Sequence, residues 1–379
     1  MISYNYTAFN DDKINHKINS YLLYIINALK NEINFDEIKL VILTGSFGQE
    51  EGGVIFNKSQ NVLEIINDID IIIFPKKYLQ FKFKYNSIIT EFSHLIISKI
   101  PAKQVDINIG NSSKFFFRKF KLFYTANAHD TIHGSKILYG DSIPEKLKNK
   151  YINKNIPLSE GTKYLYTRGS GFLIPLYCLN NNKSNISFLD MFIEINKLKL
   201  CMGDSYLIYN EKYNHSYQNR YDIAKNKSFK QLPNGLKIKN NYLNALEWKL
   251  KPYEINDINI IVKEVEDLLP IYFSYFLWYE NKRLNKKINS IKDYILFFHS
   301  QRSTIIDVIS RRYYFKNNLI IMLIILDFYK SHKLNKEYIP IIKSIFPNIL
   351  NKNKINWNKL VEDYLLLFHP TGIIKKVLS

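Results

Sequence analysis

The sequence predicts an α+β protein, in which a mixed sheet flanked by helices is followed by a mostly α-helical C-terminal region. Short β-branched runs occur between residues 38 and 109, and such residues favour strands. Beyond residue 158, apolar residues recur at three- and four-residue steps, which is typical of amphipathic helices. We therefore predict a first domain over residues 1–145 and a helical domain over residues 146–379, with a further division near 225–255 left open.

Alternating patterns predict the elements of the first domain in order. Turn residues around two short apolar pieces predict a hairpin-like excursion over residues 50–67. Helical periodicity predicts helices over residues 14–30 and 84–98. Strands are predicted over residues 38–43, 68–74, 105–109 and 137–139.

The second domain shows helical periodicity almost throughout. Helices are predicted over residues 158–179, 187–209, 257–281, 288–299, 303–329 and 357–368. Gly169-Ser170-Gly171 and Pro175 predict a weak or kinked middle for the first of them. Ser187 to Asp190 resembles a capping box. Asn-Lys clusters at 225–240 and 281–288 predict solvated loops.

Composition and charge narrow the class of protein. The 379 residues are 46% hydrophobic and 15% aromatic, with two cysteines, which fits two or three domains and no disulfide framework. No signal peptide or membrane span is expected, so we predict a cytoplasmic protein. The net charge of +19 is uneven, with +2 in residues 1–141 and +17 in the rest. Solvated helix faces explain this excess best, and a groove for phosphates or an anionic polymer is the alternative.

The residues that carry chemistry gather in residues 44–70 and on one later strand. Gly45-Ser46-Phe47-Gly48 follows a predicted strand, Asp68 and Asp70 open the next, and Asp106 lies on a third. Carboxylates two apart on a strand point to the same face. Such a set suits a pair of Mg²⁺ ions, which stabilise both the attacking and the leaving oxygen of a phosphoryl group. A glycine turn with a serine lets backbone and hydroxyl approach phosphate.

This pattern of Gly-Ser, Asp-x-Asp and a third acid resembles the DNA polymerase β-like nucleotidyltransferase superfamily. The resemblance covers the first domain and implies a polymerase β-like fold. It implies that Gly45, Ser46 and Gly48 hold an NTP such as ATP. Asp68 and Asp70 would ligate two Mg²⁺ ions, or Mn²⁺ in their place, and Asp106 would complete the acceptor-side metal site and act as general base. The gap between Ser46 and Asp68 is longer than usual, and is similar to that of bacterial members with GSFG-E-G-G-like sequences.

The helical half holds further candidates for the nucleotide site. Lys197 and Asp204 share one helix face with Cys201, and the resemblance implies that Lys197 meets the triphosphate. Arg168 lies in an apolar stripe and needs either a structural carboxylate or a phosphate as its partner. Asp204 is a candidate partner for Arg168, or a residue that orients the acceptor.

Two other patterns favour structural roles. His129 and His133 have the spacing of a helical metal pair, but Gly134 and the strand after it argue against a helix there, so we do not expect a metal site. Tyr213, Tyr217 and Tyr221 recur at four-residue steps and could stack a base. Tyrosine is abundant in this chain, with 28 residues, so ordinary packing is the favoured interpretation.

The resemblance implies an Mg-dependent enzyme that moves a nucleoside monophosphate from an NTP to a hydroxyl or phosphate acceptor. A catalytic domain followed by helices is similar to antibiotic nucleotidyltransferases, which favours a small molecule or sugar as acceptor. One alternative is RNA- or oligonucleotide-directed transfer, in tailing or second-messenger synthesis. Another is an antitoxin-type nucleotidyltransferase that modifies or binds a protein partner. A pure nucleic-acid-binding module rests on charge alone, and the oligomeric state is left open.

Overall fold

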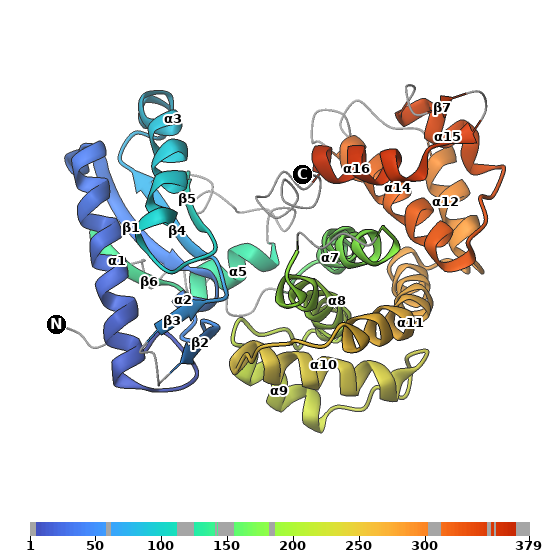
Figure 1. The fold of residues 1–379 in the computed structure, drawn as a ribbon, viewed down its shortest axis with the longest axis horizontal. Helices are drawn as coiled ribbons and strands as arrows, with labels where there is room; N and C mark the ends of the chain where they lie inside the picture. The colour runs from blue at the N-terminus through green and yellow to red at the C-terminus, as the bar shows by residue number, and fades with distance from the viewer. Residues whose placement is uncertain are drawn as a thin grey trace. The chain divides into compact units, whose positions relative to one another are not determined.

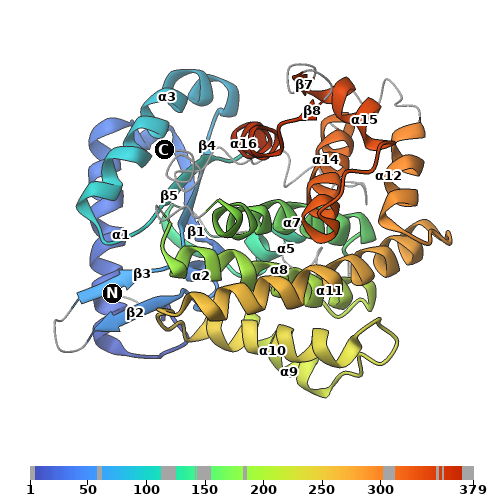
Figure 2. The same ribbon diagram turned by 45° about the vertical axis from the view of Figure 1, so that its right-hand side comes forward.

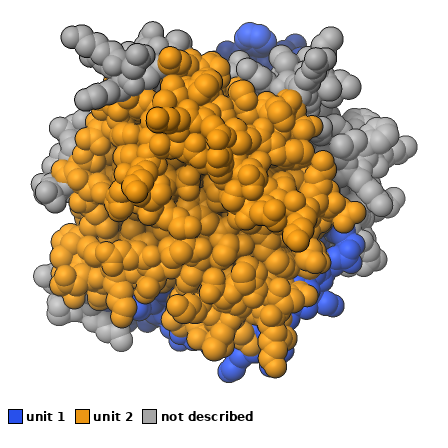
Figure 3. Space-filling model, turned by 90° about the vertical axis from the view of Figure 1, so that its right-hand side faces the viewer, with its two compact units in different colours: residues 1–157, 210–227, 246–254 blue, residues 158–209, 228–245, 255–379 orange. Residues whose placement is uncertain are grey.

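The computed structural model describes residues 5–57, 62–111, 125–140, 142, 155–181, 186–301, 312–346, 350–351 and 354–368. The chain divides into two compact units, which Figure 3 colours separately. Unit 1 comprises Met1–Pro157, Asn210–Lys227 and Leu246–Glu254. Unit 2 comprises Leu158–Tyr209, Ser228–Ala245 and Ile255–Ser379. Two segments from the second half of the chain thus belong to unit 1. The predicted boundary at residue 145 lies outside the described residues.

Unit 1 is built on a four-stranded sheet in the order β5-β4-β1-β6. β1 pairs antiparallel with β4 and β6, whereas β4 pairs parallel with β5. The sheet is therefore mixed, as the sequence predicts. Its strands are β1 (Ile38–Thr44), β4 (Ile69–Pro75), β5 (Val105–Ile109) and β6 (Lys136–Gly140).

Helices α1 (Asp12–Glu32) and α3 (Tyr78–Ile96) lie along the sheet of unit 1 (Figures 1 and 2). Their apolar faces share one core with β1, β4 and β5. α1 begins where Asp11 accepts hydrogen bonds from the amides of Lys13 and Ile14, as an N-cap does. Short 3₁₀ turns follow these helices as η1 (Phe35–Glu37) and η2 (Ile97–Lys99).

The excursion between the first two sheet strands is a hairpin, as predicted. Its strands, β2 (Val54–Asn57) and β3 (Val62–Ile65), pair antiparallel in a sheet of their own. Val54, Leu63 and Ile65 are buried in the main core of unit 1. The hairpin is therefore part of the packed body of unit 1.

Unit 2 is mostly helical, as predicted. α7 and α8 pack side by side, α11 packs on both, and α14 and α16 pack on α7. The helices are α7 (Leu158–Asn180), α8 (Phe188–Tyr209), α11 (Ile258–Leu284), α12 (Ile291–Ser300), α14 (Arg312–Ser331), α15 (Tyr338–Ile345) and α16 (Trp357–Phe368), beside a short pair of strands, β7 (Leu350–Asn351) and β8 (Lys354–Ile355). Ser187 caps α8, because its Oγ accepts from the Asp190 amide and donates to Asp190 Oδ2, so one half of the predicted capping box is present. Among the described helices, none combines the length and apolar character needed to cross a membrane.

The glycines of α7 permit close packing, and the helix runs through them. A Cβ on Gly171 would lie 2.2 Å from Glu194 Oε2 of α8, and one on Gly169 would lie 2.6 Å from the Tyr272 hydroxyl of α11. The small residues that predict a weak middle therefore admit neighbouring helices. Tertiary packing outweighs the poor helix propensity of this segment.

The two loop predictions, at 225–240 and 281–288, are wrong in part. α9 (Tyr217–Asn226) and α10 (Gly235–Leu250) are helices that the sequence analysis missed, and α11 continues to Leu284. In α10, buried Ile238, Tyr242 and Leu246 keep a helical step that the surrounding Asn and Lys residues obscure. α10 begins in unit 2, and its last turn belongs to unit 1.

Candidate functional site

The Gly-Ser turn at the end of β1 is built for close approach to a carboxylate. Gly45 begins the single turn α2 (Gly45–Gly48) with a φ of +64°, in the left-handed region. A Cβ on Gly45 would lie 2.2 Å from Asp70 Oδ2. Only glycine meets both conditions, the positive φ and the lack of space. Gly48 has a packing role, since a Cβ there would lie 2.7 Å from the Gly134 carbonyl oxygen.

Strand register places two of the three predicted carboxylates side by side. Asp70 of β4 is the Cα partner of Thr44 on one side and of Asp106 on the other. Asp68 lies one residue before β4. The strand begins one residue later than predicted, so Asp68 lies outside the two-residue alternation that was expected to place it on the same face as Asp70. The negative charge of Asp68 nevertheless acts on Asp70.

Asp70 has the most informative electrostatics of the three. Burial, together with the negative charges of Asp68 and Asp106, raises the pKa of Asp70 to about 7. The positive charge of Lys249 has the opposite effect and lowers it. Like charges crowded together disfavour the ionised form of each member. The three carboxylates thus interact electrostatically, and each disfavours ionisation of the others.

Neighbouring amides hold this cluster in place. Asn67, directly before Asp68, accepts hydrogen bonds at Oδ1 from the Ser46 hydroxyl at 3.2 Å and from the Gly53 amide at 2.7 Å. Gln104 donates from Nε2 to Asp106 Oδ1 at 2.8 Å. The Ser46 hydroxyl is therefore oriented by the same turn that leads into the carboxylates.

The donor set fits a divalent cation in chemistry. Mg²⁺ prefers oxygen ligands such as these three carboxylates. Because the carboxylates repel one another, a bound cation would also relieve that repulsion. In the part of the chain that the structure describes, however, no three His, Cys, Asp or Glu side chains are already arranged to hold a metal ion. Asp68, Asp70 and Asp106 are the residues that would hold it, after their side chains adjust.

The two glutamates after the Gly-Ser turn fasten it to distant segments. Glu50 accepts from Lys136 Nζ of β6 at 2.6 Å. The Glu51 amide donates to the Ser46 carbonyl at 2.8 Å. The Glu51 carboxylate accepts from the Ser216 hydroxyl and from the amides of Tyr217 and Gln218, at 2.6–2.9 Å. These bonds help to explain why Asn210–Lys227 belongs to unit 1.

The three periodic tyrosines make specific packing contacts. Tyr213 donates to Asp130 Oδ2 at 2.8 Å, and Tyr221 donates to Glu247 Oε1 at 2.7 Å. The ring of Tyr217 lies 4.0 Å from the guanidinium carbon of Arg220, which is 2% exposed. These contacts favour the packing interpretation, and base stacking stays the untested alternative.

The prediction against a helix at the histidine pair is wrong. Ala126–His133 forms the helix α5. Thr125 caps its start by accepting a hydrogen bond from the Ala128 amide. At its end, the Gly134 amide donates to the Asp130 carbonyl. Gly134 thus terminates the helix. His215 joins His129 and His133, with ring centroids 4.7–6.1 Å apart. Burial lowers the pKa of His215.

Arg168, Lys197 and Asp204 all lie in unit 2, whereas the carboxylate cluster lies in unit 1. The positive charge of Arg168 acts on buried Cys201. Asp204 accepts from the Tyr242 hydroxyl at 2.6 Å. Lys197 donates to Glu194 Oε1 at 2.7 Å, and that glutamate is 8% exposed. Lys197 and Asp204 therefore have structural contacts, and the nucleotide-binding roles of all three residues stay predictions.

We expect Lys197→Ala to lower the free energy of unfolding by about 1–3 kcal/mol, because buried Glu194 loses a charged partner. Thermal melts against Lys282→Ala, an exposed lysine on α11, measure the effect. An unchanged melting temperature would contradict this role. Weakened NTP binding by the folded variant would support the triphosphate role as well.

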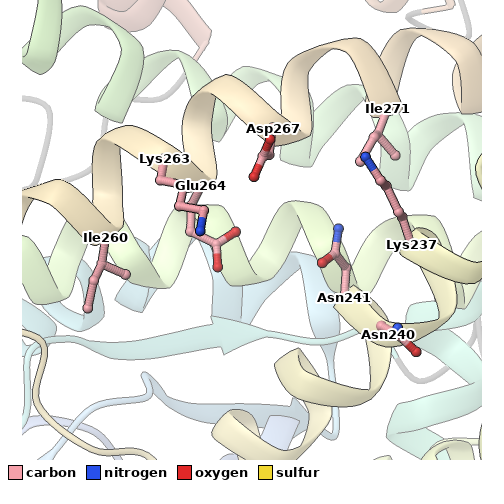
Figure 4. A pocket seen from close by; sticks show the side chains of 8 residues that line it. All are labelled: Lys237, Asn240, Asn241, Ile260, Lys263, Glu264, Asp267 and Ile271. Carbon is pink, nitrogen blue, oxygen red and sulfur yellow. The ribbon is translucent and has the colours of Figure 1, made fainter.

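A separate pocket of about 480 Å³ lies between α10 and α11 of unit 2. Figure 4 shows Ile260 at one end, Ile271 and Lys237 at the other, and acidic side chains between them. One of these acids, Glu264, accepts from buried Lys199 at 2.7 Å. The pocket is lined by both charge signs and lies in a different unit from the carboxylate cluster.

Comparisons with protein-family models, with curated proteins and with solved structures give no match. The class of protein that the fold defines is an α+β protein with a small mixed sheet and a helical C-terminal region. Sequence reasoning missed Asn67, Gln104 and Lys249. Asn67 stands one position before Asp68, and Gln104 stands two positions before Asp106. An amide side chain so close to a predicted carboxylate is a signal that could have identified both. Lys249 stands in a segment predicted only as a possible domain division.

Proposed function

We propose that the protein is a nucleotidyltransferase of the polymerase β-like kind. It would move a nucleoside monophosphate from an NTP to a hydroxyl or phosphate acceptor. The observation that carries the proposal is the approach of Asp70 to Gly45, beside Asp106. A carboxylate cluster against a glycine turn is what a metal-bound triphosphate requires. The resemblance over the first domain supports the same class.

The proposed chemistry divides among residues of unit 1. Mg²⁺, when bound by Asp68, Asp70 and Asp106, would neutralise the triphosphate charge. The acceptor oxygen forms a bond to the α-phosphorus, the bond from that phosphorus to the oxygen bridging to the β-phosphate breaks, and pyrophosphate leaves. Asp106 takes the acceptor proton, with Gln104 holding one carboxylate oxygen at 2.8 Å. The turn at Gly45 and Ser46 would hold the phosphates.

A small molecule or sugar is the proposed acceptor, in line with the resemblance to antibiotic nucleotidyltransferases. Incubation with each α-labelled NTP, Mg²⁺ and cell extract tests this, because the label moves with the α-phosphate. We expect the α-label on a small-molecule acceptor, whereas a label on the γ-phosphate should leave in pyrophosphate. Label in RNA, protein or a nucleotide dimer would overturn the acceptor class. Transfer of the γ-label to the acceptor by the purified protein would overturn nucleotidyl transfer.

A further inference from the structure

The outward side of α3 carries two exposed apolar side chains. α3 packs on β4, β5 and α1 of unit 1 (Figure 1). Its buried stripe faces that core and consists of Phe81, Tyr85, Ile89, Phe92 and Ile96. Leu79 and Phe83 stand two positions to either side of Phe81, and a helix turns by about 100° per residue, so both side chains point away from the stripe. Leu79 is 68% exposed and Phe83 is 91% exposed, where an amphipathic helix normally has polar residues.

Lysines surround this apolar pair. Lys76 and Lys77 come directly before the helix, and Lys82 and Lys84 flank the second apolar residue in the sequence. All four lysines are exposed, and no Asp or Glu occurs from residue 76 to residue 90. Lys84 is neutralised by Glu37 of η1, whose carboxylate lies 2.6 Å from its ammonium. The other three lysines give this surface an excess of positive charge.

The excess charge decides which partner fits. Two copies of the chain would bring lysines against lysines, and such like-charge contacts disfavour self-association through this surface. An anionic lipid membrane offers negative charge to the lysines and an apolar layer to Leu79 and Phe83. Apolar side chains enter the boundary between headgroups and acyl chains, while lysines extend their stems and keep their ammonium groups among the headgroups. A nucleic acid would satisfy the lysines and stack on Phe83, but it would leave Leu79 in water.

We propose that the α3 patch, which comprises Lys76, Lys77, Leu79, Lys82 and Phe83, binds the surface of an anionic lipid membrane. Leu79 and Phe83 insert into the headgroup boundary, and the three lysines contact the anionic headgroups. The helix lies on the membrane in this contact and does not cross it.

The α3 patch is separate from the carboxylate cluster. Asp70 lies near the start of β4, whereas Lys76 follows Pro75, the last residue of that strand. A strand rises by about 3.3 Å per residue, so the two sites lie toward opposite ends of β4. Membrane binding therefore does not depend on nucleotidyl transfer, and its tests need no nucleotide.

Sedimentation of the full chain with vesicles tests the proposal. We expect binding to vesicles of phosphatidylcholine that contain phosphatidylserine, a weaker binding as salt is raised, and little binding to phosphatidylcholine alone. Phe83→Ser should lower the partition coefficient about tenfold or more, because burial of the ring in the membrane is lost. Leu95→Ser is the matched control, since Leu95 is 70% exposed on the last turn of the same helix and lies outside the α3 patch. It should bind as the wild type does.

Two further variants test the charge and the insertion separately. Lys82→Gln should lower the partition coefficient about fivefold, as expected for one lysine near an anionic surface. Exposed Lys282→Gln on α11 should change it little. Phe83→Trp should keep the binding and add a tryptophan emission that shifts to the blue when phosphatidylserine vesicles are added, relative to the wild-type spectrum.

Each result decides for or against the α3 patch. Equal binding of phosphatidylserine vesicles by wild type and by Phe83→Ser, with equal melting temperatures, would overturn insertion. An unshifted emission of vesicle-bound Phe83→Trp would do the same. Binding that is indifferent to phosphatidylserine would overturn the choice of an anionic surface. A wild type that binds no vesicles, but binds a single-stranded oligonucleotide in a way that Phe83→Ser weakens, would assign the patch to nucleic acid and overturn the proposal.

Discussion

We expect Asp70→Asn to lower nucleotidyl transfer by roughly two to three orders of magnitude with the fold intact, because it removes a preorganised charge from the reacting centre. Asn has almost the same shape, so the contact with Gly45 survives. Turnover of labelled NTP measures the loss. Turnover within a factor of two of the wild type would remove Asp70 from the site.

The same variant should be more stable than the wild type above neutral pH when no metal is present. The pKa of Asp70 rises from its ordinary value of 3.8 to about 7 in the folded protein. Its contribution to stability is therefore complete below the unfolded pKa and is lost as pH rises through about 7. Asp70→Asn does not titrate and escapes this loss. Thermal melts from pH 4 to 8 measure the difference, and parallel curves for the two proteins would contradict the raised pKa.

Gly45→Ala should damage both stability and turnover. A non-glycine residue in the left-handed region costs roughly 1–2 kcal/mol, and the new Cβ would also displace the Asp70 carboxylate, 2.2 Å away. Misplacement of a reacting group by about 1 Å costs on the order of a hundredfold in rate. Melting and turnover of the single variant give both numbers.

Asp70→Ala provides the control for this clash. In that background, Gly45→Ala should cost less stability, because the backbone penalty remains while the carboxylate oxygen is gone. Equal costs in the two backgrounds would show that Gly45 does not serve the approach of Asp70.

The sequence predicted what depends on local pattern. β-branched runs predicted the strands of the sheet, and a capping box predicted the start of α8 at Phe188. The three acids were found from the order of a Gly-Ser turn, an Asp-x-Asp pair and an acid on a later strand. The structure adds that Asp70 and Asp106 are register partners. The helix at His129 was missed because Gly134 and the strand after it were taken as evidence against a helix, whereas Gly134 follows the last helical residue, His133.

The rest depended on contacts between distant residues. Glu51 binds the start of α9, and the charge of Lys249, near the end of α10, acts on Asp70. Neither interaction leaves a periodic signal. Asn-Lys clusters obscured α10 and the end of α9. The basic residues that stood out, Arg168 and Lys197, both lie in unit 2, where Lys197 pairs with Glu194.

The central claim is that Asp68 and Asp70 serve metal-dependent nucleotidyl transfer. Its most direct measurement compares wild type with Asp68→Asn/Asp70→Asn, using α-labelled NTPs, cell extract and either Mg²⁺ or EDTA. The account predicts labelled product from the wild type with Mg²⁺, and none from the double variant or with EDTA, while both proteins melt cooperatively. Equal labelling by the two folded proteins would contradict it.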